Sequence, residues 1–186
     1  MTGTSEVMTR IERLEGVHYP VLVPNQKGLD NLMSLLSSHT TSLRSKGHPP
    51  LTDEISVFTG ATDAFTRANV NMTVAESLGR LAPVTDTAIS KGLRVRGYIS
   101  VVIMCPYSGP VDYKTVRDVA KALIDMGCYQ VSLGDTVGMG TPAQVGDMIE
   151  EVKKAVPAAK LAVSVPTSRI RRKHSTFFAK GHVSII

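Results

Sequence analysis

Residues 127–142, "GCYQVSLGDTVGMGTP", combine a strand signal with a turn and a helix start. The segment 129–135 is rich in apolar and β-branched residues and ends at Asp135, after which two glycines interrupt the pattern. Thr141 and Gln144 then have the spacing of a helix capping box. A strand followed directly by a helix is the repeating unit of parallel α/β folds.

The same strand signal recurs along the chain at starts roughly 30 to 40 residues apart, the length of a βα unit. Strict alternation of strands and helices predicts a parallel sheet. A (β/α)₈ barrel typically needs about 250 residues, so the fold class predicted for this chain is an open doubly wound sheet or an incomplete barrel. The five predicted strands are 19–23, 54–60, 94–103, 129–135 and 160–163.

Two features of the intervening segments predict irregularities. The helix expected at 74–91 begins with a capping box of Thr73 and Glu76 and contains Pro83, which should kink it. The segment 37–53 is rich in Ser, Thr, Gly and Pro and is predicted to be a surface loop.

The positive charge of the chain is confined to its end. Of 186 residues, 21 are basic and 16 acidic, a net charge of +5. Residues 164–186 contain five basic residues and no acid, so the first 163 residues are neutral. We therefore expect neither a nucleic-acid nor a membrane partner for the folded part. The amino-terminal residues show no signal-peptide pattern, and two cysteines make no disulfide framework, which favours a reducing compartment.

The glycine pattern at 138–143 matches G-x-G-x-x-A, but a dinucleotide site is not predicted. The glycines come several residues after the strand, and Ser164 follows the next strand where an acid should bind the ribose. Asp135 is then open to two interpretations, a site residue at the carboxyl end of a parallel strand or the cap of its own turn. Other polar residues at or near strand ends are Asn25, Thr59, Ser100, Ser132 and Thr136.

The cysteines and histidines predict no metal site made by the protein. The five histidines show no H-x-H or H-x-x-x-H spacing. Cys105 has no histidine near it in sequence and is predicted to be a loop thiol, whereas Cys128 is predicted to be a core residue.

Four stretches together resemble the hydroxymethylglutaryl-CoA lyase family, in order and across roughly residues 1 to 163: "YPVLVPNQKGL", "FTGATDAFTRANVNMTVAES", "RVRGYISVVIMCPYSGPVDYKTV" and "GCYQVSLGDTVGMGTP". The resemblance implies a (β/α)₈ barrel with Mg²⁺ or Mn²⁺ at the carboxyl ends of its strands. It implies cleavage of 3-hydroxy-3-methylglutaryl-CoA to acetyl-CoA and acetoacetate, in leucine breakdown and ketone-body formation. It also suggests a homodimer and a mitochondrial, peroxisomal or cytoplasmic location.

In that resemblance Asp135 aligns with an acidic residue of the family's active site. Ser132 and Thr136 lie beside it and are predicted to bind substrate, as are Asn25 and Ser100 at the ends of other strands.

The chain also departs from the family pattern. The R-D-G-L-Q motif of the first strand has no counterpart, and Ser164 and Pro166 stand where the family has the two metal-binding histidines of H-x-H. We therefore expect none of the family's metal ligands in this chain, no lyase activity of the chain alone and poor stability, because a partial barrel leaves strand edges unpaired. The alternative function is an inactive fragment or pseudoenzyme.

The predicted organisation is a partial barrel domain at 1–163 and a divergent, irregular basic tail at 164–186. The βα pattern ends abruptly after Val163, and the composition changes there from neutral to basic. Two hypotheses stay open for the tail: translated intron or frameshifted sequence, or a genuine disordered basic tail.

Overall fold

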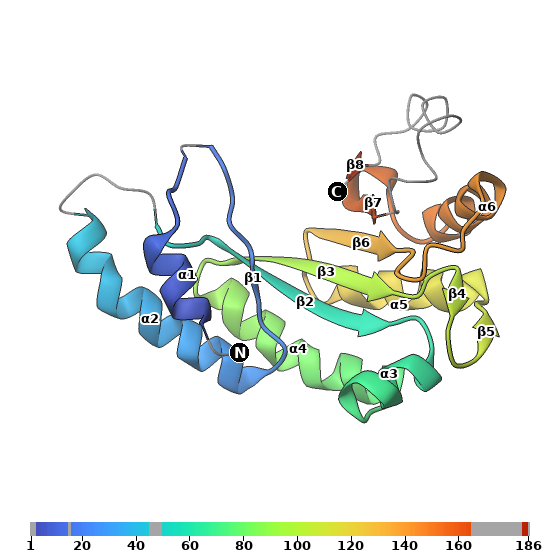
Figure 1. Ribbon diagram of the computed structural model, residues 1–186, viewed down its shortest axis with the longest axis horizontal. Helices are drawn as coiled ribbons and strands as arrows, with labels where there is room; N and C mark the ends of the chain where they lie inside the picture. The colour runs from blue at the N-terminus through green and yellow to red at the C-terminus, as the bar shows by residue number, and fades with distance from the viewer. Residues whose placement is uncertain (1–2, 15, 45–49, 165–183, 186) are drawn as a thin grey trace.

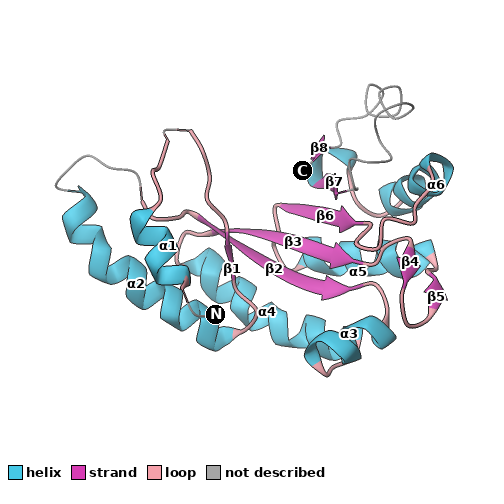
Figure 2. Cartoon of the chain, in the orientation of Figure 1, coloured by secondary structure: helices cyan, strands magenta, loops and turns pink. Residues whose placement is uncertain are grey.

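The computed structural model describes residues 3–14, 16–44, 50–164 and 184–185 (Figure 1). Strands and helices alternate through most of this part of the chain, as Figure 2 shows by colour. The elements in order are α1 (Thr4–Arg10), β1 (Val21–Leu22), α2 (Gln26–Arg44), β2 (Glu54–Gly60), α3 (Asp63–Val70), α4 (Val74–Ser90), β3 (Arg94–Ser100), β4 (Met104–Cys105), β5 (Gly109–Pro110), α5 (Tyr113–Asp125), β6 (Gln130–Gly134), α6 (Pro142–Lys153), the 3₁₀ turn η1 (Ala158–Lys160), β7 (Leu161–Ser164) and β8 (Ser184–Ile185).

The main sheet is parallel throughout and has the order β1-β2-β3-β6-β7-β8. Strands β4 and β5 form a separate antiparallel pair beside the ends of β3 and β6 (Figure 1). The first five strands of the sheet correspond to the five predicted ones, so the fold is a partial (β/α)₈ barrel. The sixth, β8, was not predicted: two residues of the tail pair with β7, and the tail is to that extent regular.

The two faces of the sheet differ in what covers them. Helices α4 and α5 pack on one face (Figure 1). A Cβ added at Gly97 of β3 would lie 3.0 Å from Leu123 of α5, so Gly97 and its register partners Val57 and Val131 face the helices. Because side chains alternate along a strand, the opposite face, here called the open face, carries the intervening residues. These are Ser56, Phe58, Arg96, Tyr98, Gln130, Ser132 and Ala162.

The boundaries differ from the predictions at two places. The strand predicted over 94–103 ends at Ser100, because Val101 has a left-handed φ of 58° that no extended strand can continue. The loop predicted over 37–53 begins later, because α2 continues to Arg44. The serines that suggested a loop instead donate to carbonyls of their own helix, as Ser37 does to Met33 and Ser38 to Leu35.

The predicted helix starts are confirmed. Both capping boxes form, with Thr73 and Glu76 at α4 and Thr141 and Gln144 at α6. Helix α4 is one continuous element with Pro83 inside it, and the kink expected at Pro83 stays a prediction. The basic residues at 169–180 lie outside the described residues. No helix in the described part of the chain is long and apolar enough to cross a membrane.

Candidate active site at the carboxyl edge of the sheet

Asp135 directly follows β6 at the carboxyl edge of the sheet and is 4% exposed. Its Oδ1 accepts from the backbone N–H of Gly138 at 3.1 Å, and its Oδ2 accepts from that of Gly140 at 2.8 Å. A Cβ at Gly140 would lie 2.8 Å from Oδ2, so only glycine allows this close approach. The hydrogen bonds therefore support the interpretation that Asp135 caps its own turn. They fix the carboxylate at the edge where ligands bind in parallel α/β folds.

Thr136 links this turn to the end of β3. Its Oγ1 accepts a hydrogen bond of 2.7 Å from the backbone N–H of Val101, so one lone pair of the hydroxyl oxygen is used within the protein. Ser100, the last residue of β3, is half-buried and immediately precedes Val101. The structure therefore brings together three of the predicted site residues, Ser100, Asp135 and Thr136.

Ser132 lies on the open face of β6 and is 1% exposed. Its hydroxyl has no hydrogen-bond partner among the residues that the structure describes. A buried polar group without a partner costs free energy, and such groups are uncommon in native proteins. Ser132 thus has hydrogen-bonding capacity to spare in the middle of β6, three residues before Asp135. Ser100, Ser132, Asp135 and Thr136 are called the carboxyl-edge group below.

Asn25 does not join this group. It follows β1, which is separated from β6 by β2 and β3. Its Oδ1 accepts from the backbone N–H of Gly28 at the start of α2. Asn25 instead lines a cavity of about 690 Å³ between α1, β1 and α2. Thr59 also lies outside this group. It pairs with Ile99 and faces the helices rather than the open face.

The two cysteines have opposite chemistry. Cys105 is buried in β4 and Thr62 donates to its sulfur at 3.2 Å. Burial would raise the pKa of Cys105, but hydrogen bonds from Ser108, Thr62 and nearby backbone amides outweigh it and lower the pKa to about 7. Burial alone raises the pKa of Cys128 to about 12, which fits the predicted core role.

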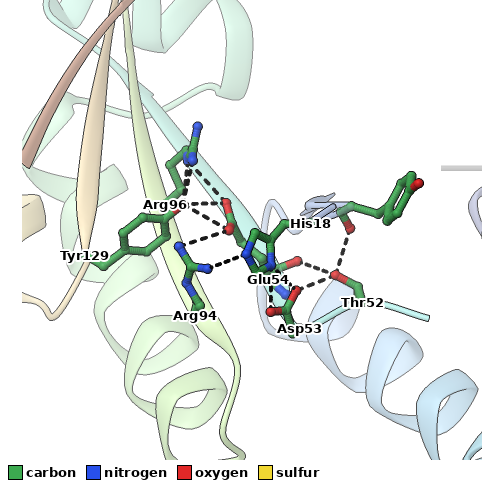
Figure 3. A network of polar contacts seen from close by, with 8 residues as sticks. His18, Thr52, Asp53, Glu54, Arg94, Arg96 and Tyr129 are labelled. Atoms are coloured by element: carbon green, nitrogen blue, oxygen red, sulfur yellow. Dashed lines mark hydrogen bonds and ion pairs between the residues drawn. The ribbon is translucent and has the colours of Figure 1, made fainter. Parts of the chain in front are cut away.

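A polar network at the amino edge of the sheet was not predicted (Figure 3). Glu54, the first residue of β2, is 1% exposed and accepts from the Tyr129 hydroxyl at 2.9 Å. It also forms an ion pair with Arg96, whose Nε lies 3.1 Å from Glu54 Oε1 and donates to the Tyr129 hydroxyl. Arg94 lies 4.1 Å over the Tyr129 ring and donates to His18 Nε2, whose Nδ1 bonds Asp53. Charged residues at alternate positions of predicted strands, as in "RVRGY", were the available signal. His18, Asp53, Glu54, Arg94, Arg96 and Tyr129 are called the amino-edge network below.

The donor set at the carboxyl edge does not fit a divalent cation. The described residues contain no group of three His, Cys, Asp or Glu side chains that could hold a metal ion. Both oxygens of Asp135 accept backbone hydrogen bonds, and the residue of β7 nearest to it, Ser164, contributes its carbonyl to the Asp135 N–H at 3.0 Å. The Mg²⁺ or Mn²⁺ implied by the family resemblance would need ligands beyond these residues.

A parallel sheet with helices on one face is the architecture of part of an α/β barrel. The HMGL-like family model matches residues 35–167. The chain therefore belongs to the HMGL-like family.

Individual relatives agree with this assignment. The chain is 40% identical over 163 residues to the cytoplasmic 3-hydroxy-3-methylglutaryl-CoA lyase of Rattus norvegicus, covering 88% of this chain and 43% of that protein. It is equally similar to the mitochondrial hydroxymethylglutaryl-CoA lyase of the same species, covering 46% of that protein. The crystal structure of hydroxymethylglutaryl-CoA lyase from Pseudomonas aeruginosa superposes with a TM-score of 0.84 at 36% identity, covering 100% of this chain and 57% of that one. The chain thus spans about half the length of the relatives it matches.

Proposed function

We propose that this chain supplies the substrate-binding and proton-transfer part of a hydroxymethylglutaryl-CoA lyase site. The observation that carries the proposal is the carboxyl-edge group: a buried hydroxyl without a partner on β6 and a fixed carboxylate directly after that strand, in a segment that matches the HMGL-like family. The related proteins from Rattus norvegicus carry the name of this lyase. The substrate proposed is accordingly 3-hydroxy-3-methylglutaryl-CoA.

The chemistry asks for a base near the C3 hydroxyl of the substrate. Asp135 accepts that proton, the C2–C3 bond breaks as the C3–O bond becomes a carbonyl, and the electron pair passes to the thioester enolate of acetyl-CoA. Return of the proton from Asp135 to C2 of that enolate completes the products, acetyl-CoA and acetoacetate, and restores the carboxylate. The amides of Gly138 and Gly140 hold the carboxylate in place while leaving each oxygen a further lone pair to receive the proton.

The other members of the group have supporting roles in this proposal. Ser132 donates its free hydroxyl to a substrate oxygen on the open face, and Ser100 lines the same edge. No step is assigned to a metal, since the described residues do not provide its ligands. For this reason we expect the 186 residues alone to bind the acyl-CoA without cleaving it.

A second function, an acyl-CoA-binding pseudoenzyme, is favoured by the same missing ligand set. It shares the binding site and lacks the chemistry. A homodimer and a mitochondrial, peroxisomal or cytoplasmic location are further proposals. They are supported by the family assignment and, for location, by relatives named mitochondrial and cytoplasmic.

Calorimetric binding of 3-hydroxy-3-methylglutaryl-CoA and an acetoacetate assay, each with Mg²⁺, Mn²⁺ or EDTA, test these functions together. We expect saturable binding that Ser132→Ala weakens and no acetoacetate from the 186 residues alone. Acetoacetate release would instead mean that other residues complete the metal site. In that case Asp135→Asn should lower the rate at least about 100-fold, while Asp147→Asn on the exposed side of α6 leaves it unchanged. Absence of binding would overturn both functions.

A further inference from the structure

Val101 has a backbone conformation that its residue type disfavours. Only two non-glycine residues in the described part of the chain have a positive φ, Asn71 and Val101. Asn71 caps the end of α3, where Asn commonly adopts the left-handed conformation. A β-branched residue rarely does so, and Val101 is also 1% exposed at the end of a central strand. Such a conformation persists only where the surrounding structure enforces it.

The hydrogen bonds around Val101 show what enforces it. The ladder between β3 and β6 runs as far as the pair Ile99 and Leu133. Beyond it, the Val101 N–H turns to Thr136 Oγ1 at 2.7 Å, and the next N–H, of Val102, bonds the carbonyl of Gly134 at 3.2 Å. A side-chain oxygen therefore replaces the ladder acceptor for one residue, in the manner of a bulge.

This local turn connects the two halves of the carboxyl edge. It ends β3 at Ser100, and it directs residues 101–105 across the Asp135 turn. A Cβ at Gly140 would lie 3.3 Å from Ile103 and 2.8 Å from Asp135 Oδ2, so these segments are in close contact. The bond between the Val101 N–H and Thr136 thus joins the residue after Ser100 to the residue after Asp135.

We propose that Thr136 is a positioning residue: its hydroxyl oxygen holds Val101 in the left-handed conformation and so fixes Ser100 against the Asp135 turn. This reassigns Thr136 from substrate contact to orientation of the site. The importance of the orientation rests on the proposed function, but the clamp between Thr136 and Val101 is a property of the fold and is testable without substrate.

The first test compares Thr136→Val, which keeps the shape and loses the acceptor, with Thr136→Ser, which keeps it. Amide hydrogen exchange and amide chemical shifts of the full chain are measured by NMR. In Thr136→Val the Val101 amide should exchange about tenfold faster, and the amides of Ser100, Ile103 and Gly140 should shift together. Thr136→Ser should restore both signals. Equal exchange rates in the two variants would overturn the clamp.

The second test measures the strain at Val101 by chemical denaturation of matched pairs. Val101→Gly and Val101→Ala both remove the two γ-methyl groups, but only glycine adopts the positive φ without strain. The unfolding equilibrium constant of Val101→Gly should therefore be about fivefold lower than that of Val101→Ala. Val131, buried in β6 with extended geometry, is the control, and there Gly should unfold more readily than Ala. The same order of Gly and Ala at both positions would overturn the inference.

The clamp and the proposed function fail separately. Loss of acyl-CoA binding with normal results in these two tests removes the function and leaves the clamp. Intact binding in a Thr136→Val variant whose Ser100 and Gly140 amides do not move removes the clamp and leaves the function.

Discussion

The two edges of the parallel sheet treat polar groups in opposite ways. At the amino edge, Glu54 is nearly inaccessible and faces three donors, from Tyr129, Arg96 and Arg94 (Figure 3). At the carboxyl edge, the buried hydroxyl of Ser132 has no partner among the described residues, and the Asp135 carboxylate is held by backbone amides. One edge satisfies its polar groups with one another, whereas the other retains a hydroxyl that has no partner in the part of the chain that the structure describes.

This difference is the basis of our proposal that the polar groups of the amino edge are structural and those of the carboxyl edge functional. A fully partnered buried network fixes the register of its strands and has no free group to offer a ligand. An unpartnered hydroxyl and a strained backbone are costs that folds usually retain at functional sites. The amino edge should therefore be sensitive in stability and the carboxyl edge sensitive in binding.

The largest effect should come from breaking the amino-edge network at its centre. Glu54→Gln leaves the half-buried Arg96 beside a neutral amide, and removing one partner of a buried charge pair costs about 3–5 kcal/mol. Urea denaturation should show this fall in the free energy of unfolding. Glu150→Gln is the control, since its pair with Lys153 is exposed and contributes at most about 1 kcal/mol. Similar losses for both variants would remove the structural role of Glu54.

A smaller effect on the free energy of unfolding is expected when one hydroxyl is removed from each edge. Tyr129→Phe removes the donor to Glu54 and should lower the free energy of unfolding by about 1.5–3 kcal/mol. Burial, ahead of the Glu54 carboxylate, raises the pKa of Tyr129, so the hydroxyl is protonated and donates at neutral pH. Ser132→Ala removes an unpartnered group and should leave stability unchanged or raise it by about 1 kcal/mol. A large loss for Ser132→Ala would show that Ser132 is a structural residue too.

The smallest effect concerns the pH dependence of stability near the carboxyl edge. A thiol whose pKa is lowered to about 7 on folding binds fewer protons when folded than when unfolded. Its thiolate therefore stabilises the fold above the unfolded pKa of about 8.5, and this contribution is lost as pH falls through about 7. Stability should rise by about 1–2 kcal/mol between pH 6.5 and 8.5, and Cys105→Ser should flatten the rise.

Cys128 provides the matched control for this slope. Burial raises its pKa to about 12, so the folded protein keeps that thiol protonated throughout the range. Cys128→Ala should lower stability through lost packing and leave the rise between pH 6.5 and 8.5 in place. A rise that persists in Cys105→Ser and disappears in Cys128→Ala would contradict the assignment of the two thiols.

The sequence predicts the strands well because the signals are local. Hydrophobic alternation and capping boxes require only neighbouring residues, and both capping boxes form as expected. The predicted start of the loop at residue 37 was wrong because a serine-rich stretch suits a loop or a helix equally. The hydrogen bonds from Ser37 and Ser38 to carbonyls of their own helix decide between the two.

The candidate site was predictable only in part. Asp135 stood out because it follows a strand directly, but nothing in the sequence indicated that the Thr136 hydroxyl oxygen accepts from a backbone N–H 35 residues away. Asn25 also follows a strand, but β2 and β3 separate that strand from β6, so Asn25 lies away from the carboxyl-edge group. This could not be predicted because strand order is not visible in the sequence. Glu54, Arg96 and Tyr129 were missed for the same reason: their network forms only when β2, β3 and β6 are neighbours.

The most direct measurement of the contrast between the two edges is hydrogen–deuterium exchange of the full chain with and without 3-hydroxy-3-methylglutaryl-CoA. Ligand should protect the peptides that contain Ser100–Cys105 and Asp135–Gly140, while those that contain Glu54, Arg94 and Tyr129 remain unchanged. Protection confined to the amino-edge peptides, or to the cavity between α1 and α2, would contradict the assignment of the carboxyl edge as the functional site.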